Sequence, residues 1–197
     1  MWCITKVSFI FMKYTDDINI FKLNKDFTAE IDITGTFGHI YHYPQRMNGC
    51  LFILCLRGEC DITIHLSEHK IQKNDIVTIL PETFVHVHRQ SPDCRLYLVG
   101  FNKELLNGIN FFNSTKNYLS ALIDTPVTPL RPETSELFQD YFMLLIKMKH
   151  IEAKPNKDLL SSMLLTILHG VGNLHQHTNV TTRAFNRGEE IVKRLVQ

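Results

Sequence analysis

The stretch LFILCLRGECDITIHL, residues 51–66, holds the pattern on which the fold prediction depends. It contains two short runs rich in apolar and β-branched residues, 51–56 and 61–66, separated by a turn at Arg57 and Gly58. Runs of this kind, bounded by turn residues, are typical of β-strands. Their spacing of roughly ten residues favours a sandwich or small barrel over alternating strands and helices. The sequence predicts further strands at 37–43, 76–80, 84–88 and 96–101, with turns at 67–70, 73–75 and 91–93.

The apolar pattern changes to helical spacing after Phe101. One stripe consists of Leu137, Tyr141, Leu144, Met148 and Ile151, and a second of Leu160, Leu164, Ile167, Val171 and Leu174. This spacing predicts two amphipathic helices, and a short connector at Pro155 and Asn156 makes them antiparallel neighbours. Each helix carries more apolar surface than one docking face uses, so we expect contact with a second copy of the chain. The expected dimer interface consists of Leu137, Tyr141, Leu144 and Met148; packing of both helices on their own domain alone is the alternative.

The composition is that of a globular protein. Of its 197 residues, 44% are hydrophobic, and the formal net charge of +1 provides no overall basic field for nucleic acid. Five cysteines, an odd number without a C-x-x-C pair, argue against a disulfide framework and favour a reducing compartment. No apolar run approaches the ~18 residues of a membrane span. We expect a soluble, cytoplasmic protein without a membrane segment, a poor signal peptide at the start being the alternative.

Three local motifs resemble the sensor half of AraC-type transcriptional regulators. They are MNG at 47–49 followed by a strand and LRGE at 56–59; NDIVTILP at 74–81 followed by His86; and RGEEIVKRLV at 187–196. The resemblance implies an α+β protein, with a cupin-like (jelly-roll) β-barrel followed by an antiparallel helical hairpin. It also implies a homodimeric, ligand-sensing domain whose DNA contact is made by a C-terminal domain absent from these residues.

The resemblance divides the chain into four parts. Residues 1–36 are expected to form an N-terminal arm and first strands, and residues 37–130 the cupin-like sensor barrel. Residues 131–177 correspond to the dimerisation hairpin, and 178–197 to a linker and the truncated start of the DNA-binding domain. The polar linker itself is predicted to begin at Asn173, which places His175 and His177 in solvent.

The resemblance also implies a small-molecule site inside the barrel. Tyr41 and Tyr43 would share one face of the first strand because side chains alternate along a strand. Tyr43, just before Pro44, matches a ligand-contacting position of the family. Ordinary core packing explains the same residues equally well, and the effector's identity stays open between small aromatic or amphipathic metabolites. The predicted ligand-binding residues are Tyr41, Tyr43, His86, Leu96 and Leu98.

A metal-dependent enzyme is not expected. Counted from Gly58, the carboxylate position of metal-binding cupins falls on Leu51, and the paired histidine positions on Gln45 and Met47 or on Pro44 and Arg46. His86 alone fits a ligand position, so we predict no metal, no cofactor and no catalytic residues.

Two other functions are kept as alternatives. They are a stand-alone cupin-fold enzyme and a ligand-free structural dimerisation module, the latter favoured by a filled interior. His39, His86 and His88 could in principle form a three-nitrogen metal site. Cys55 and Cys60 are predicted to be buried, inert thiols. His65 and His69 are predicted to be exposed beside a hairpin turn.

Overall fold

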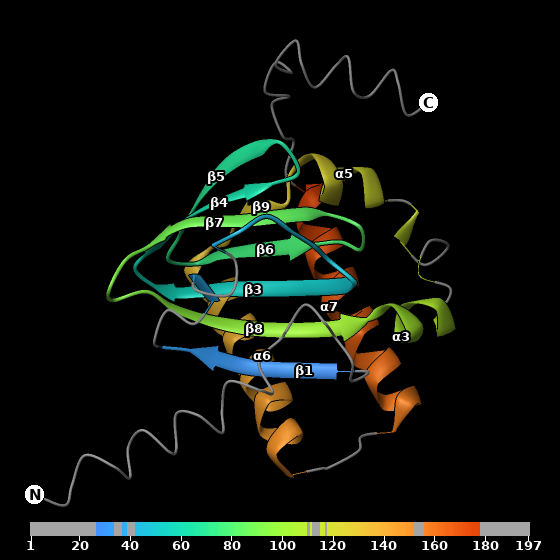
Figure 1. Ribbon diagram of the computed structural model, residues 1–197. Helices are drawn as coiled ribbons and strands as arrows, with labels where there is room; N and C mark the ends of the chain where they lie inside the picture. Colours follow the sequence, from blue (N-terminus) through green and yellow to red (C-terminus); the bar gives the residue numbers. More distant parts are fainter. Residues whose placement is uncertain are drawn as a thin grey trace, which may run out of the picture.

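The computed structural model describes residues 27–33, 37–38, 42–109, 111, 115–116, 118–151 and 156–177. Within these residues, the strands form two antiparallel sheets that pack face to face, and two long helices lie behind one of the sheets (Figure 1). The larger sheet has the order β1 (Phe27–Asp32), β8 (Arg95–Asn102), β3 (Gly49–Arg57), β6 (Asp75–Ile79), β9 (Val127–Pro129). The smaller sheet has the order β2 (Gln45–Arg46), β7 (Phe84–Gln90), β4 (Glu59–Ile64), β5 (Ser67–Gln72).

Strand β3 shows how the two cores arise. Because its side chains alternate, Leu51 and Ile53 enter the core between the two sheets. Cys50 and Phe52 enter a second core, which the larger sheet shares with the helices. A strand that is covered on both faces needs apolar residues at every position, which explains the uninterrupted apolar run at 51–56.

The helices after the sandwich are α3 (Lys103–Gly108), α5 (Leu119–Asp124), α6 (Pro132–Ile151) and α7 (Lys157–His177). The Tyr141 hydroxyl on α6 donates to the Met163 carbonyl at 3.2 Å. The Phe138 ring lies over Gly170, where an added Cβ would be 3.2 Å from Cζ. An earlier residue of α6 therefore meets a later residue of α7, so the two helices pack against each other in antiparallel directions. The predicted α+β architecture is confirmed.

The first predicted strand, 37–43, is wrong where the structure describes it. Phe37 and Gly38 lie in a helical turn, and His42 and Tyr43 lie in a bend. Phe37 is fully buried, and its backbone N–H donates to the Asp32 carboxylate at 3.2 Å. Residues 39–41 lie outside the described residues.

Two predicted loops are also wrong. Residues 67–70 belong to β5, and the turn lies at His65 and Leu66, where His65 adopts a φ of 57°. β5 is an edge strand, so its polar side chains can face solvent while its backbone pairs with β4. Residues 173–177, predicted as a linker, continue α7 to His177. The rest of the predicted linker and the final predicted helix lie outside the described residues.

Candidate functional site

The structure does not bring the predicted ligand-binding residues together. Tyr43 lies in the bend before β2 and is 74% exposed. His86 lies on the outer face of β7, where its Nε2 is 2.8 Å from the His42 carbonyl oxygen. Leu96 and Leu98 point between the sheets and are 0% and 1% exposed. Tyr41 lies outside the described residues.

The space between the sheets is filled by apolar side chains of the described residues. Leu51 and Met47, at positions where metal-binding cupins carry ligands, are among them. Val85 and Val87, the inward neighbours of His86, contribute from β7. Alternation along β7 therefore points His86 and His88 outward, where their ring centroids are 4.2 Å apart. Among the described residues, no three His, Cys, Asp or Glu side chains are arranged to hold a metal ion.

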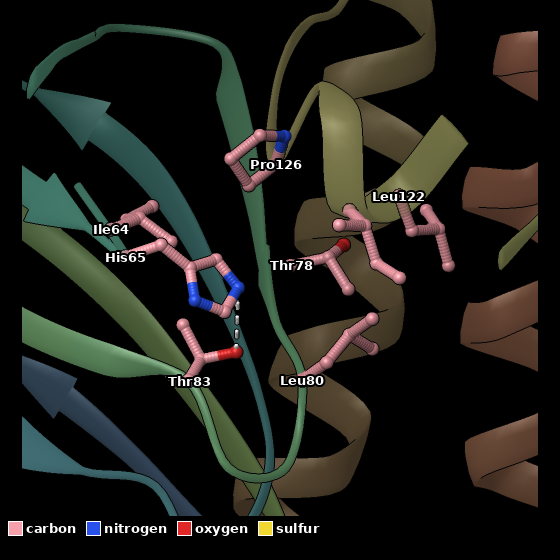
Figure 2. A pocket seen from close by; sticks show the side chains of 8 residues that line it. Ile64, His65, Thr78, Leu80, Thr83, Leu122 and Pro126 are labelled. Atoms are coloured by element: carbon pink, nitrogen blue, oxygen red, sulfur yellow. Dashed lines mark hydrogen bonds between the residues drawn. The ribbon is translucent and has the colours of Figure 1, made fainter. Parts of the chain in front are cut away.

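A small cavity lies instead where α5 meets the end of the sandwich (Figure 2). Its volume is about 10 Å³, close to the space that one water molecule needs. Figure 2 shows the Thr78 side chain between the His65 ring on one side and Leu122 on the other. The complete lining consists of Ile64, His65, Thr78, Leu80, Thr83, Leu122, Ile123 and Pro126.

Thr78 contributes a buried hydroxyl group to the lining of this cavity. It is 2% exposed, and its hydroxyl oxygen is buried without a hydrogen-bond partner among the described residues. Its backbone N–H donates to the Pro126 carbonyl at 2.8 Å, which holds β6 against the segment that leads into β9. Buried hydroxyl groups almost always have a partner, so an unpartnered one beside a cavity marks a place for a hydrogen-bonding group.

His65 supplies a second polar group to the cavity. Its backbone N–H donates to the Phe84 carbonyl at 2.8 Å, which fixes the β4–β5 turn beside Thr83. The ring Nε2 lies 3.4 Å from Oγ1 of Thr83. Desolvation lowers the pKa of His65, so its ring is neutral at neutral pH and can either donate or accept a hydrogen bond. The prediction that His65 is exposed is confirmed, yet its ring also lines the cavity.

An exposed apolar side chain lines the cavity at its outer edge. Ile123 lines it and is 48% exposed. Phe84 is also exposed, but it shares the outer face of β7 with His86 and so points away from the space between the sheets. The polar groups of the cavity therefore have one exposed apolar neighbour, the Ile123 side chain.

The predicted dimer residues divide into two groups. Leu137 and Leu144, seven positions apart on α6, are 69% and 53% exposed, and Ile151 continues this row at 82%. Tyr141 and Met148 are partly buried and pack against the core shared by the larger sheet and the helices. An exposed row with a spacing of seven residues is the pattern that helices use to pair with another helix.

His175 is a residue that the sequence prediction placed wrongly in a solvated linker. It lies in α7, with Nδ1 3.2 Å from Oγ1 of Thr125 and Nε2 3.2 Å from Oγ1 of Thr128. Desolvation lowers the pKa of His175. The apolar periodicity that continues through Val171 and Leu174 was the signal that the helix extends this far. His177 is in the same helix, and its side chain lies outside the described residues.

Among the residues that the structure describes, four cysteines are free and buried: Cys50, Cys55, Cys60 and Cys94. In the part of the chain that the structure describes, the helices are too short or too polar to span a bilayer.

Residues 31–169 match the family model of the AraC-like ligand binding domain. No curated protein matches the sequence significantly. Three similar solved structures are apo ToxT from Vibrio cholerae, the AraC-like transcriptional activator CuxR, and the cupin domain of Schizosaccharomyces pombe Cnp3.

The likeness to these structures extends over much of the chain at low identity. ToxT is 8% identical to this chain with a TM-score of 0.45, and the match covers 88% of this chain and 65% of ToxT. CuxR is 10% identical with a TM-score of 0.43, and the match covers 86% of this chain and 56% of CuxR. The Cnp3 domain is 14% identical with a TM-score of 0.34, and the match covers 46% of this chain and 66% of Cnp3. This chain spans about 65% of the length of the ToxT chain. Its antiparallel sandwich followed by two packed helices is the predicted cupin-like fold. Because the family model covers most of the sequence, the chain belongs to the AraC-like ligand binding domain family.

Proposed function

We propose that this chain is the ligand-sensing and dimerising half of an AraC-type DNA-binding transcriptional regulator. Membership of a ligand-binding domain family supports the sensing role. The proposed sensing role rests mainly on the buried Thr78 hydroxyl, which has no hydrogen-bond partner among the described residues and lies beside the cavity. Leaving such a group unpaired costs about 1–3 kcal/mol, so a ligand that hydrogen-bonds to Thr78 gains this free energy on binding.

The cavity also limits the class of effector. Only a group about the size of a water molecule fits beside Thr78 and His65, such as a hydroxyl or one oxygen of a carboxylate. The rest of the effector would lie over the exposed side chain of Ile123, which lines the cavity. This arrangement suits a small amphipathic or aromatic metabolite, because a free sugar needs several polar partners.

The dimer would form along α6. Leu137, Leu144 and Ile151 make one exposed apolar row, which a second copy of the same helix can cover. An effector acts on such a dimer only if it binds two arrangements of the subunits with different affinity. DNA would be contacted by a C-terminal domain outside these residues, in the cytoplasm, and the domain would bind its ligand without transforming it.

A ligand-free dimerisation module is the second candidate. It is favoured by Leu96 and Leu98, which fill the space between the sheets where the sequence predicted a pocket. In that case the cavity beside Thr78 would hold nothing larger than water.

A thermal-shift screen of metabolites separates the two candidates. The screen uses the unmodified chain, Thr78→Val, and Thr28→Val as a matched control in β1 of the same sheet. The proposal expects a compound that stabilises the unmodified chain and the control by several degrees, and Thr78→Val by much less. Equal stabilisation of all three proteins would place the ligand elsewhere, and a screen without any stabilising compound would favour the ligand-free module.

A further inference from the structure

Two histidines lie side by side on the outer face of the smaller sheet. His86 and His88 both belong to β7, and their ring centroids are 4.2 Å apart. Val87, between them in the chain, points into the core between the sheets and is 2% exposed. His86 is half-buried and His88 is exposed, so a dissolved ion can reach the pair from solvent.

A β-bulge in β7 sets the position of the second ring. Val87 and Arg89 pair with consecutive residues of β4, whereas His88, between them, has no register partner in that strand. A bulge changes the direction of a side chain and is common beside functional sites. The irregular backbone at this point therefore decides where the His88 ring leaves the strand.

Hydrogen bonds hold one nitrogen of each ring. Nε2 of His86 lies 2.8 Å from the His42 carbonyl oxygen, which can only accept, so Nε2 carries the proton of the neutral ring. Nε2 of His88 lies 2.6 Å from Oγ1 of Thr63, and this hydroxyl can accept in the same way. Each ring then keeps a lone pair on Nδ1, for which the described residues supply no hydrogen-bond partner. A metal-binding imidazole almost always has its other ring N–H held by such an acceptor.

The charged side chains around the pair do not oppose a cation. Arg89 follows His88, but its guanidinium lies 2.7 Å from a Glu59 oxygen and 2.9 Å from an Asp61 oxygen. The Lys70 ammonium lies 2.6 Å from the other Glu59 oxygen. The two positive and two negative charges balance, so a divalent ion meets no unpaired cation among these four side chains.

We propose that His86 and His88 form a surface site for a divalent transition-metal ion, and that Cu²⁺ binds there most tightly. Imidazole nitrogen suits Cu²⁺, Ni²⁺ and Zn²⁺, and affinity for a given set of nitrogen ligands is highest for Cu²⁺. Rings whose centres are 4.2 Å apart are close enough for one ion to lie ~2.0–2.1 Å from a nitrogen of each. Water completes the coordination of the ion.

This site is separate from the interior of the sandwich. The positions where metal-binding cupins carry ligands are filled there by Leu51 and Met47, on the other face of the smaller sheet from the histidine pair. The site also does not rest on the effector cavity or on the proposed regulatory function.

The test is a calorimetric titration of Cu²⁺ into the folded chain, prepared without a polyhistidine tag and with Cys3→Ser to remove a thiol outside the described residues. The proposal predicts one Cu²⁺ per chain at this pair, bound more tightly than Ni²⁺ or Zn²⁺. His86→Ala and His88→Ala should each weaken binding by about tenfold or more.

His150→Ala is the matched control. His150 on α6 is also an imidazole held by a backbone carbonyl, since its Nδ1 lies 2.7 Å from the Ile146 oxygen, but it has no second histidine beside it in the described residues. Its removal should leave the affinity for Cu²⁺ unchanged.

Nuclear magnetic resonance of the chain with both histidines intact decides the question even if a variant fails to fold. Cu²⁺ at less than one equivalent should broaden the ring signals of His86 and His88 before those of the histidines in α6 and α7. Three results would overturn the proposal: no Cu²⁺ binding, an affinity that depends on only one of the two histidines or on neither, and broadening that begins at the helices.

Discussion

The Nδ1 atom of His175 lies 3.2 Å from Oγ1 of Thr125, and its Nε2 lies 3.2 Å from Oγ1 of Thr128. Because the Thr125 hydroxyl donates to the Ala121 carbonyl at 2.7 Å, it accepts a hydrogen bond from Nδ1–H of the ring. Nε2 then accepts from Thr128, which requires the neutral ring. His175 thus connects the last turns of α7 to α5, which lines the cavity, and to β9.

The first prediction is that His175 makes the free energy of unfolding dependent on pH. Desolvation lowers its pKa in the folded state below the ordinary value of 6.5, so the unfolded chain binds the proton more readily. The stabilisation is therefore complete above pH ~6.5 and is lost as pH falls toward the lowered pKa. Urea denaturation between about pH 7.5 and 5.5 should show a smaller loss of stability in His175→Gln than in the unmodified chain. The same loss in both proteins would show that His175 titrates normally.

The second prediction concerns stability in the absence of effector. Thr78→Val replaces an unpartnered hydroxyl by a methyl group, so the variant should be as stable as the unmodified chain or more stable, by up to about 1–3 kcal/mol. Thr128→Val removes a hydroxyl that bonds to His175 and should destabilise the chain by about 1 kcal/mol. Denaturant unfolding of both variants shows whether each substitution raises or lowers the free energy of unfolding. A destabilised Thr78→Val would mean that its hydroxyl has a partner after all.

The third prediction is that α6 forms the dimer contact. Leu144→Glu places a charge in the exposed row and should give a folded monomer, because an unpaired charge in a dimer seam is costly. Leu66→Glu, at the more exposed turn after β4, should leave the dimer intact. Light scattering at tens of micromolar protein gives the molecular mass, and so the oligomeric state, of each variant. A monomeric unmodified chain, or a dimeric Leu144→Glu, would move the interface away from this row.

The fourth prediction compares two helical glycines. An added Cβ at Gly172 would lie 2.7 Å from Cγ of Tyr118, a ring that is 5% exposed, whereas at Gly108 nothing lies within 4 Å. Gly172→Ala should therefore destabilise the chain by about 1–3 kcal/mol. Gly108→Ala should be neutral or slightly stabilising. Thermal unfolding of the two variants checks the packing of α7 on the segment before α5, and equal midpoints would contradict it.

The sequence pattern was sufficient to predict the sandwich and both long helices. The runs 51–56, 76–80 and 96–101 are apolar because the larger sheet is buried on both faces. Such continuous apolar runs are easily recognised in the sequence. β5 was missed because an edge strand tolerates polar residues, and its pairing with β4 comes from backbone atoms. The end of α7 was missed because His175 is polar but bonded to two threonines about 50 residues away in the chain, which a local pattern does not reveal.

The candidate site was harder to predict than the fold. Motif spacing placed His86 inside the barrel, but strand alternation with the buried Val85 and Val87 turns it outward. Thr78 lies inside the motif NDIVTILP, whose pattern predicts only a strand at this position. Its significance depends on the missing hydrogen-bond partner and on the approach of α5, and both are properties of the tertiary structure.

The most direct test of the central claim is the dissociation constant of an effector found by the thermal screen, measured by calorimetry on three proteins. Loss of a hydrogen bond to Thr78 is worth about 1.4 kcal/mol, so Thr78→Val should bind about tenfold more weakly than the unmodified chain. Thr28→Val should bind as the unmodified chain does. An unchanged dissociation constant in Thr78→Val would contradict the assignment of the cavity beside α5 as the effector site.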